Sequence, residues 1–111
     1  MSLPQLQIPK LFDVSGKIAL ITGGGSGLGE MMATSLVQNG ARVIIASRKE
    51  KALKQVADKL TAQGPGRCEY IVADLGSAQG CKSLCEEVKK RTDKLDILVN
   101  NSVRPLKLLP F

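Results

Sequence analysis

The sequence predicts an α/β fold with one parallel sheet of four strands. Two observations indicate this fold: short apolar runs alternate with amphipathic segments between residues 17 and 100, and a glycine-rich segment at 22–29 directly follows the first apolar run. Each run is apolar throughout, as expected for strands that helices cover on both faces. With right-handed crossovers, the predicted sheet is doubly wound, has the strand order 3-2-1-4 and is truncated after the fourth strand.

The first three elements follow from local patterns. A short apolar run at 17–21 ends at a cluster of glycines and predicts a buried strand. In the helix expected at 28–39, apolar residues recur three and four positions apart, and the pair Asn39-Gly40 is a typical stop signal. The second strand, at 42–47, is rich in β-branched residues, which favour strands.

The remaining elements continue the alternation. The second helix, at 49–63, has a stripe of apolar side chains opposite its lysines and ends at a Gly-Pro-Gly sequence. A third strand is expected at 68–73 and a third helix at 77–92, where Gly80 weakens the first turn. The fourth strand is expected at 95–100.

The length and composition suit one small domain. The 111 residues, 43% of them hydrophobic, can bury a modest core. We divide them into an irregular lead-in at 1–15, an α/β half-domain at 16–102 and a divergent tail at 103–111. No apolar run approaches the roughly 20 residues of a membrane helix, and the lead-in has prolines and glutamines where a signal peptide is apolar. We therefore expect a cytoplasmic protein that does not bind membranes.

The basic charge does not indicate a nucleic-acid partner. The formal net charge is +6, but the basic residues are interspersed with carboxylates along the helical segments. Aromatic residues, which could stack on bases, make up only 3% of the chain. We interpret the basic residues as a solvated surface.

The three cysteines do not predict a metal site. The sequence contains no histidine, so neither a common zinc site nor a histidine-based catalytic triad is expected. Cys81 and Cys85 lie four residues apart, on one face of the third predicted helix. We interpret them as buried side chains, with a metal or redox role as the alternative.

The glycine-rich segment suits a ligand with phosphate groups. It reads Thr22-Gly23-Gly24-Gly25-Ser26-Gly27-Leu28-Gly29 and lies between the first strand and the first helix. Glycines let the backbone approach a pyrophosphate, and the start of the helix offers free N–H groups and the positive end of its dipole. A P-loop is disfavoured because Glu30 follows the last glycine in place of lysine. The alternative is a tight turn whose glycines serve only packing.

The end of the second strand favours NADP over NAD. An acidic residue about 20 positions after the loop would bind the ribose hydroxyls of NAD, but Ser47, Arg48 and Lys49 occupy this region. Without a carboxylate to repel it, a 2′-phosphate would meet a cation and a hydroxyl. The alternative is that Arg48 and Lys49 merely begin a solvated helix.

Three motifs at the expected intervals resemble the short-chain dehydrogenase/reductase (SDR) family. They are Thr-Gly-x-x-x-Gly-x-Gly from Thr22, Asp74-Leu75 after the third strand, and Leu-Asp-Ile-Leu-Val-Asn-Asn at 95–101. The resemblance runs from about Phe12 to Asn101. It implies a partial Rossmann fold, with an NAD(P)-binding half-domain at 16–102.

The resemblance also implies roles for individual residues. Asp74 would hydrogen-bond the adenine amino group and Leu75 would flank the ring, while Asn100 and Asn101 would steady the sheet and line the cofactor cleft. From the residues alone, Asp74 could instead cap the segment that follows it. The loop residues implied to bind the cofactor are Thr22, Gly23, Gly25, Ser26, Gly27, Leu28 and Gly29.

The catalytic residues of the family are not found in this sequence. The only tyrosine, Tyr70, belongs to the third strand, and no catalytic serine or Tyr-x-x-x-Lys pair follows Asn101. In the family, that tyrosine supplies the proton that hydride transfer to a carbonyl requires. We therefore expect no catalytic residues and no activity from this chain alone. The change after Ser102 is expected for a truncated or spliced product or an erroneous gene model.

Two functions are consistent with these patterns. The first is the NADP-binding portion of an SDR-type oxidoreductase that transfers a hydride between alcohol and carbonyl carbons in its full-length form. The second is a non-catalytic nucleotide-binding or interaction module. Such a module would pair with another chain, or with itself, through the exposed edge of the fourth strand.

Overall fold

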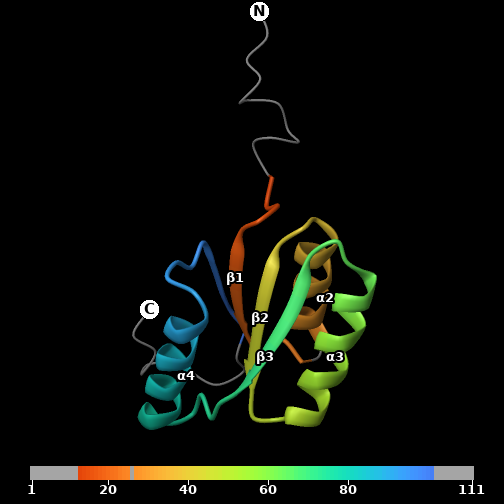
Figure 1. Ribbon diagram of the computed structural model, residues 1–111. Helices are drawn as coiled ribbons and strands as arrows, with labels where there is room; N and C mark the ends of the chain where they lie inside the picture. Colours follow the sequence, from red (N-terminus) through yellow and green to blue (C-terminus); the bar gives the residue numbers. More distant parts are fainter. Residues whose placement is uncertain (1–12, 26, 102–111) are drawn as a thin grey trace, which may run out of the picture.

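The computed structural model describes residues 13–25 and 27–101, which form a four-stranded parallel sheet with helices on both faces (Figure 1). The sheet order β3-β2-β1-β4 and the parallel pairing of all neighbours confirm the predicted fold class. The predictions for Ser26 and for residues 1–12 and 102–111 lie outside the described residues. The strands are β1 (Ile18–Thr22), β2 (Arg42–Ser47), β3 (Arg67–Val72) and β4 (Ile97–Asn100), and the helices are α2 (Gly27–Gln38), α3 (Glu50–Gln63) and α4 (Ala78–Arg91).

The sheet separates two apolar clusters. β1 lies between β2 and β4, so that Leu20 is in register with Ile44 on one side and Leu98 on the other. Successive side chains of a strand point to opposite faces. Figure 1 shows α2 and α3 on one face of the sheet and α4 on the other. Ile21 and Ile45 therefore belong to the cluster with residues of α2 and α3, whereas Leu20 and Ile44 pack with Leu84 of α4.

The helix ends explain how α2 and α4 are positioned. Gly40 ends α2 with a φ of +88°, and its N–H donates to the carbonyl of Val37 at 3.1 Å. The hydroxyl of Ser77 accepts from the N–H of Gly80 at 3.0 Å and caps the start of α4. None of the helices in the described part of the chain has the length and apolar character needed to cross a membrane.

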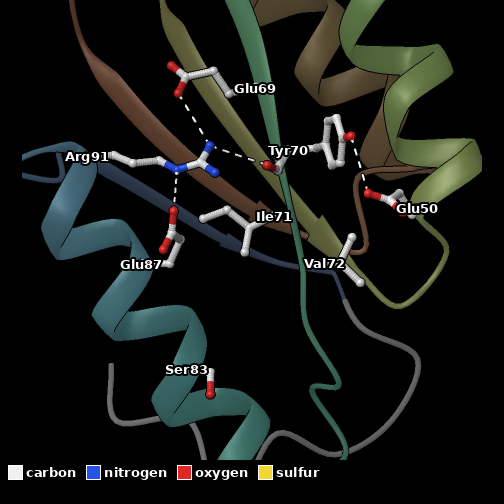
Figure 2. A pocket seen from close by; sticks show the side chains of 8 residues that line it. All are labelled: Glu50, Glu69, Tyr70, Ile71, Val72, Ser83, Glu87 and Arg91. Atoms are coloured by element: carbon white, nitrogen blue, oxygen red, sulfur yellow. Dashed lines mark hydrogen bonds and ion pairs between the residues drawn. The ribbon is translucent and has the colours of Figure 1, made fainter.

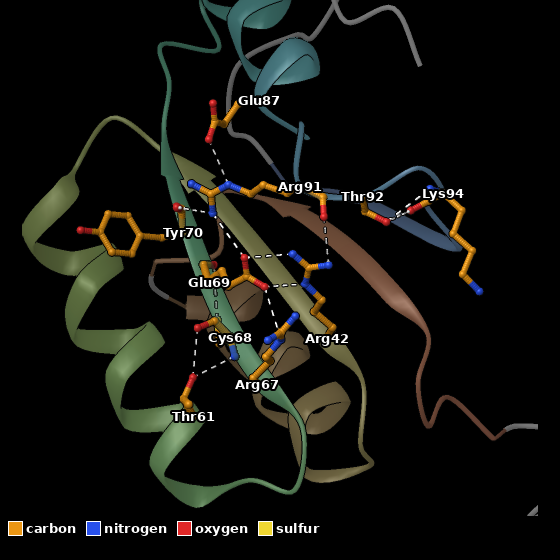
Figure 3. A network of polar contacts seen from close by, with 10 residues as sticks. All are labelled: Arg42, Thr61, Arg67, Cys68, Glu69, Tyr70, Glu87, Arg91, Thr92 and Lys94. Atoms are coloured by element: carbon orange, nitrogen blue, oxygen red, sulfur yellow. Dashed lines mark hydrogen bonds and ion pairs between the residues drawn. The ribbon is translucent and has the colours of Figure 1, made fainter. Parts of the chain in front are cut away.

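The outer edge of β3 is partly closed by side chains. The N–H groups of Arg67 and Ala73 donate to carbonyls of Ala41 and Ser47, on the side of β2. Backbone groups of successive residues in a strand point to opposite sides within the sheet, so those of Cys68 point away from β2. The hydroxyl of Thr61 accepts from the N–H of Cys68 at 2.9 Å and donates to its carbonyl at 3.0 Å (Figure 3). One hydroxyl thus satisfies both outward groups of Cys68.

The other edge strand, β4, is only partly buried. Within the described residues β4 pairs with β1 alone, and every second residue of β4 is exposed. The side chain of Leu98 is 38% exposed on this strand. In the part of the chain that the structure describes, the expectation that the fourth strand is an exposed edge is therefore confirmed, whereas β1 and β2 are mostly buried.

Candidate functional site

The glycine loop packs tightly against its surroundings at two positions. A Cβ on Gly24 would lie 2.8 Å from the Cβ of Ile45, and a Cβ on Gly29 would lie 2.9 Å from the Cα of Gly24. Real Cβ atoms essentially never come within 3.0 Å of an atom to which they are not covalently connected, so side chains at these positions would displace the loop. Some of the glycines therefore serve packing, which was the alternative interpretation of the motif.

Gly27, in the same loop, faces open space. Gly23 and Gly27 have φ values of +73° and +58°, in the left-handed region that glycine tolerates best. No atom lies within 4 Å of a Cβ built on Gly27. The loop thus leaves room above its backbone at the start of α2, where the free N–H groups of a helix favour an anion. Packing alone does not account for this arrangement.

The loop forms one wall of a cavity of about 580 Å³ at the carboxyl ends of the strands. This is the size of a typical ligand site. The cavity brings together the loop, the end of β2 and the segment after β3, as predicted from the order of the parallel strands. Its lining residues are Gly23, Gly25, Gly27, Leu28, Ser47, Arg48, Lys49, Ala52, Ala73, Asp74, Leu75, Gly76 and Asn101.

Ala52, Ala73 and Gly76 were not singled out from the sequence. Ala73 and Gly76 adjoin the predicted pair Asp74-Leu75, so their proximity could have been found from that motif. Ala52 belongs to α3 and reaches the cavity because α3 packs against the loop, where a Cβ on Gly25 would lie 3.8 Å from the Cβ of Ala52.

Three of the predicted residues do not line the cavity: Thr22, Gly29 and Asn100. Thr22 is fully buried, and its hydroxyl donates to Oδ1 of Asn100 at 3.0 Å. The backbone N–H of Asn101 donates to the same hydroxyl at 3.1 Å. Nδ2 of Asn101 donates to the carbonyl of Gly23 at 3.4 Å, which ties the loop to the end of β4.

The end of β2 presents positive charge to the cavity. Arg48 and Lys49 are exposed, and the hydroxyl of Ser47 accepts from the N–H of Lys49 at 3.2 Å. This bond holds the turn that leads into α3. Arg48 is exposed and lines the cavity, and its long cationic side chain is suited to an anion.

Asp74 turns back on its own segment and does not cap α4. Oδ1 of Asp74 accepts from the N–H of Gly76 at 2.9 Å, while the capping residue of α4 is Ser77. Ser77 is thus the cap of α4, while Asp74 holds the segment that follows it through the N–H of Gly76, as the alternative interpretation expects. The Asp74 side chain is exposed and lies on the cavity lining, where a carboxylate can accept a hydrogen bond from an amino group.

A second cavity, of about 620 Å³, lies along the edge of β3 (Figure 2). Arg91 crosses it and contacts Glu87, Glu69 and the backbone carbonyl of Tyr70. The hydrogen bond from Arg42 lowers the pKa of Glu69, against the opposing effect of burial. Because these charges are paired with one another, the cavity offers a ligand few open polar groups.

Tyr70 belongs to this second cavity and not to the first. Its hydroxyl donates to Glu50 at 3.4 Å (Figure 2). Tyr70 is absent from the lining of the cavity at the glycine loop. That Tyr70 is not the family's proton donor stays a prediction.

Comparison with known proteins identifies the family. A model of the family described as short chain dehydrogenase matches residues 17–106. This chain belongs to the short-chain dehydrogenase family. The predicted resemblance, which rested on the glycine loop, Asp74-Leu75 and the Asn100-Asn101 pair, is confirmed.

Individual relatives support the same assignment. The rhamnolipids biosynthesis 3-oxoacyl-[acyl-carrier-protein] reductase of Pseudomonas aeruginosa is 43% identical over 91 residues, which cover 82% of this chain and 35% of the relative. The solved Pseudomonas aeruginosa RhlG/NADP active-site complex has a TM-score of 0.77 at 43% identity, covering 82% of this chain and 36% of that chain. An NADH-dependent reductase complexed with NAD has a TM-score of 0.72 at 32% identity, covering 79% and 36%.

These matches cover only part of the relatives. The present chain spans about a third of the length of the curated relatives that it matches. The shared part is the region that contains the glycine loop and the four strands. The similar structures include complexes with NADP and with NAD, so the comparisons leave the choice between the two open.

Proposed function

We propose that this chain binds NADP(H) and forms the cofactor-binding part of an oxidoreductase that transfers a hydride between alcohol and carbonyl carbons. The observation that carries the proposal is the cavity at the carboxyl ends of the strands. In it, the open backbone of the glycine loop, the cations after β2 and the carboxylate of Asp74 face one space. A dinucleotide presents a pyrophosphate, a ribose and an adenine, which are the groups that these side chains and backbone groups can bind.

Each part of the cofactor has a matching chemical group in this cavity. The N–H groups at the start of α2 would hold the pyrophosphate, and Asp74 would accept a hydrogen bond from the adenine amino group. Arg48 and Ser47 would hold a 2′-phosphate, and no carboxylate follows Ser47 directly to repel it. NADP is therefore the preferred cofactor and NAD the less favoured alternative.

The described residues bind and orient the cofactor, but they do not supply the proton transfer that the reaction also needs. The bound nicotinamide would supply or accept the hydride. A proton must also move at the substrate oxygen, and Tyr70 lies in the other cavity. We therefore propose that the 111 residues alone have no dehydrogenase activity, and that the activity belongs to a longer form of the protein. The predicted cytoplasmic location stays a prediction.

The first test is direct binding of NADPH to the purified chain. The sequence contains no tryptophan, so the fluorescence of NADPH can be followed with little protein background. We expect an enhanced and blue-shifted emission that saturates with protein concentration. A chain that is folded by circular dichroism and gives no response would contradict the proposal.

The second test addresses the choice between NADP and NAD. Arg48→Asp should weaken NADPH binding about tenfold or more, because a charge-assisted hydrogen bond contributes about 1.5–3 kcal/mol. The affinity for NADH should change far less. Lys90→Asp makes the same change of charge in the last turn of α4, away from the cavity, and serves as the matched control. Equal effects of Arg48→Asp on both cofactors would remove the basis for NADP.

A second candidate function is pairing with another protein chain through β4. It is favoured by the partial exposure of β4, whose neighbour in the described residues is β1 alone. Unpaired strand edges are templates for further strands. Leu98→Lys should then shift the chain from dimer to monomer in light-scattering measurements after size exclusion. A wild-type chain that is monomeric at high concentration would exclude self-pairing.

A further inference from the structure

Gly80, in the first turn of α4, lies against the backbone of Asp74. A Cβ built on Gly80 would meet the carbonyl oxygen of Asp74 far inside the 3.0 Å limit, and would lie 2.7 Å from the carbonyl carbon of the same residue. It would also lie 3.0 Å from the hydroxyl oxygen of Ser77. The atoms in the way are backbone, so no rotation of a side chain can relieve the clash. Any residue larger than glycine must push the two segments apart.

The helix side of this contact is firmly held. The next two inward residues of α4, Cys81 and Leu84, are 1% and 0% exposed. Leu84 packs with Leu20 and Ile44 beneath the sheet. Moving α4 would open a gap in this cluster, which costs free energy for every methyl group that loses its contacts.

The other side of the contact is a surface turn. Asp74 and Gly76 are exposed, and the turn is held by the bond from the N–H of Gly76 to Oδ1 of Asp74. Ser77 adds long bonds of 3.4 Å from its N–H and its hydroxyl to the carbonyl of Asp74. A side chain at position 80 would therefore displace this turn before it displaced α4.

Displacing the carbonyl of Asp74 also displaces its carboxylate, because both belong to one residue. The clash requires a shift of more than an ångström, and hydrogen bonds lose most of their strength over such a distance. We propose that Gly80 is a positioning residue for the adenine end of the cavity, which lets Asp74 sit where it can select an amino-bearing base. This inference rests on the proposed NADP(H) function.

The test compares NADPH with its analogue in which hypoxanthine replaces adenine. The analogue has an oxygen in place of the amino group, so Asp74 loses the amino donor and meets an acceptor oxygen at that position. We expect the wild-type 111-residue chain to prefer NADPH about tenfold, the value of one charge-assisted hydrogen bond. In Gly80→Ala this preference should fall to about twofold or less. A general loss of stability would instead weaken both ligands equally and leave the ratio unchanged.

Gly66→Ala is the matched control. A Cβ on Gly66 would lie 2.8 Å from the carbonyl oxygen of Val37, another backbone clash, but Gly66 precedes β3 and does not line the cavity. This variant should lose stability without changing the preference for the base. Asp74→Ala removes the acceptor for the adenine amino group, so it should abolish the preference and shows the ratio expected without this hydrogen bond. Ser77→Ala loosens the same turn without a clash and should lower the preference for adenine two- to threefold. This variant replaces Gly80→Ala in the test if Gly80→Ala does not fold.

The outcomes separate the two proposals. If the wild-type chain does not bind NADPH, the proposed function fails. If it binds NADPH with a preference for adenine that Gly80→Ala retains, the role of Gly80 is wrong while the proposed function stands. An unchanged preference in Ser77→Ala would count against the inference in the same way.

Discussion

The hydroxyl of Thr22 donates to the side-chain oxygen of Asn100 across 3.0 Å and joins the ends of β1 and β4. The two residues are 78 positions apart in the sequence. Thr22 is fully buried, and it is also the residue from which the glycine loop departs. The contact therefore couples the position of the loop to that of β4.

Thr22→Val tests this coupling. Valine has the shape of threonine without the hydroxyl, so the variant should lose about 1–2 kcal/mol in the free energy of unfolding, as expected for a partly buried hydrogen bond. Urea unfolding followed by circular dichroism measures the loss. Thr22→Ser keeps the hydroxyl and should retain more stability than Thr22→Val, although it loses a methyl group. The reverse order would show that the methyl group matters more than the hydrogen bond.

The sequence was enough to predict that Arg48 and Asp74 lie at the same cavity. Both follow strands whose apolar runs are unmistakable, and parallel strands place their carboxyl ends along the same edge of a sheet. The strand order 3-2-1-4 is the one expected for a doubly wound fold, and right-handed crossovers then decide which face of the sheet each helix covers. The positions of the motifs in the fold could therefore be predicted without knowing any side-chain contact.

The contacts of Glu69 and Gly80 could not be predicted in this way. Glu69 lies 27 residues from Arg42 and 22 from Arg91, and each of these charges taken alone resembles a solvated surface residue. Gly80 was interpreted only as a weakness in its helix. Its close approach to Asp74 depends on where the turn after β3 meets α4, which the local pattern does not encode.

Glu69 makes stability depend on pH. Its pKa is lowered mainly by the hydrogen bond from Arg42, against the opposing effect of burial, with further attraction from Arg42, Arg67 and Arg91 (Figure 3). A lowered carboxyl pKa stabilises the fold above the unfolded pKa of about 4.3, and this contribution is lost as the pH falls through the folded value. Glu69→Gln should therefore be less stable than wild type at pH 7, and the difference should shrink between about pH 5 and pH 3.

Glu86→Gln provides the comparison for this prediction. Glu86 is exposed on α4, and the same substitution there should change the free energy of unfolding by less than about 0.5 kcal/mol at any pH. Urea unfolding at pH 7, 5 and 3 gives all the required values. A difference between wild type and Glu69→Gln that stays constant from pH 7 to pH 3 would show that the carboxylate charge does not stabilise the fold.

Thr61 protects the edge of β3. Its hydroxyl occupies both outward backbone groups of Cys68, which would otherwise be open to a further strand (Figure 3). Thr61→Val should cost about 1 kcal/mol in stability and shorten the lag before aggregation, because the strand edge becomes accessible. Light scattering under agitation measures the lag. Thr61→Ser retains the hydroxyl and should aggregate like wild type, so a short lag in both variants would refute a role for the hydroxyl.

The buried thiol of Cys68 should resist alkylation in the folded chain. Burial, with a smaller effect of Glu69, raises the pKa of this thiol to about 12, so at pH 8 only about one molecule in ten thousand carries the reactive thiolate. Cys85 is half-buried, and its side chain is more accessible than those of Cys68 and Cys81. Iodoacetamide at pH 8 should therefore label Cys85 first, as located by mass spectrometry of peptides.

Unfolding removes the protection of Cys68 and supplies the control for its labelling. In concentrated urea all three thiols lose their burial, and their labelling rates should become similar. The ratio of native to unfolded rates then reports local opening around β3, and Thr61→Val should raise this ratio for Cys68 more than for Cys81. Labelling of Cys68 in the native chain as fast as that of Cys85 would show that β3 is not held against α3 as the hydrogen bonds of Thr61 require.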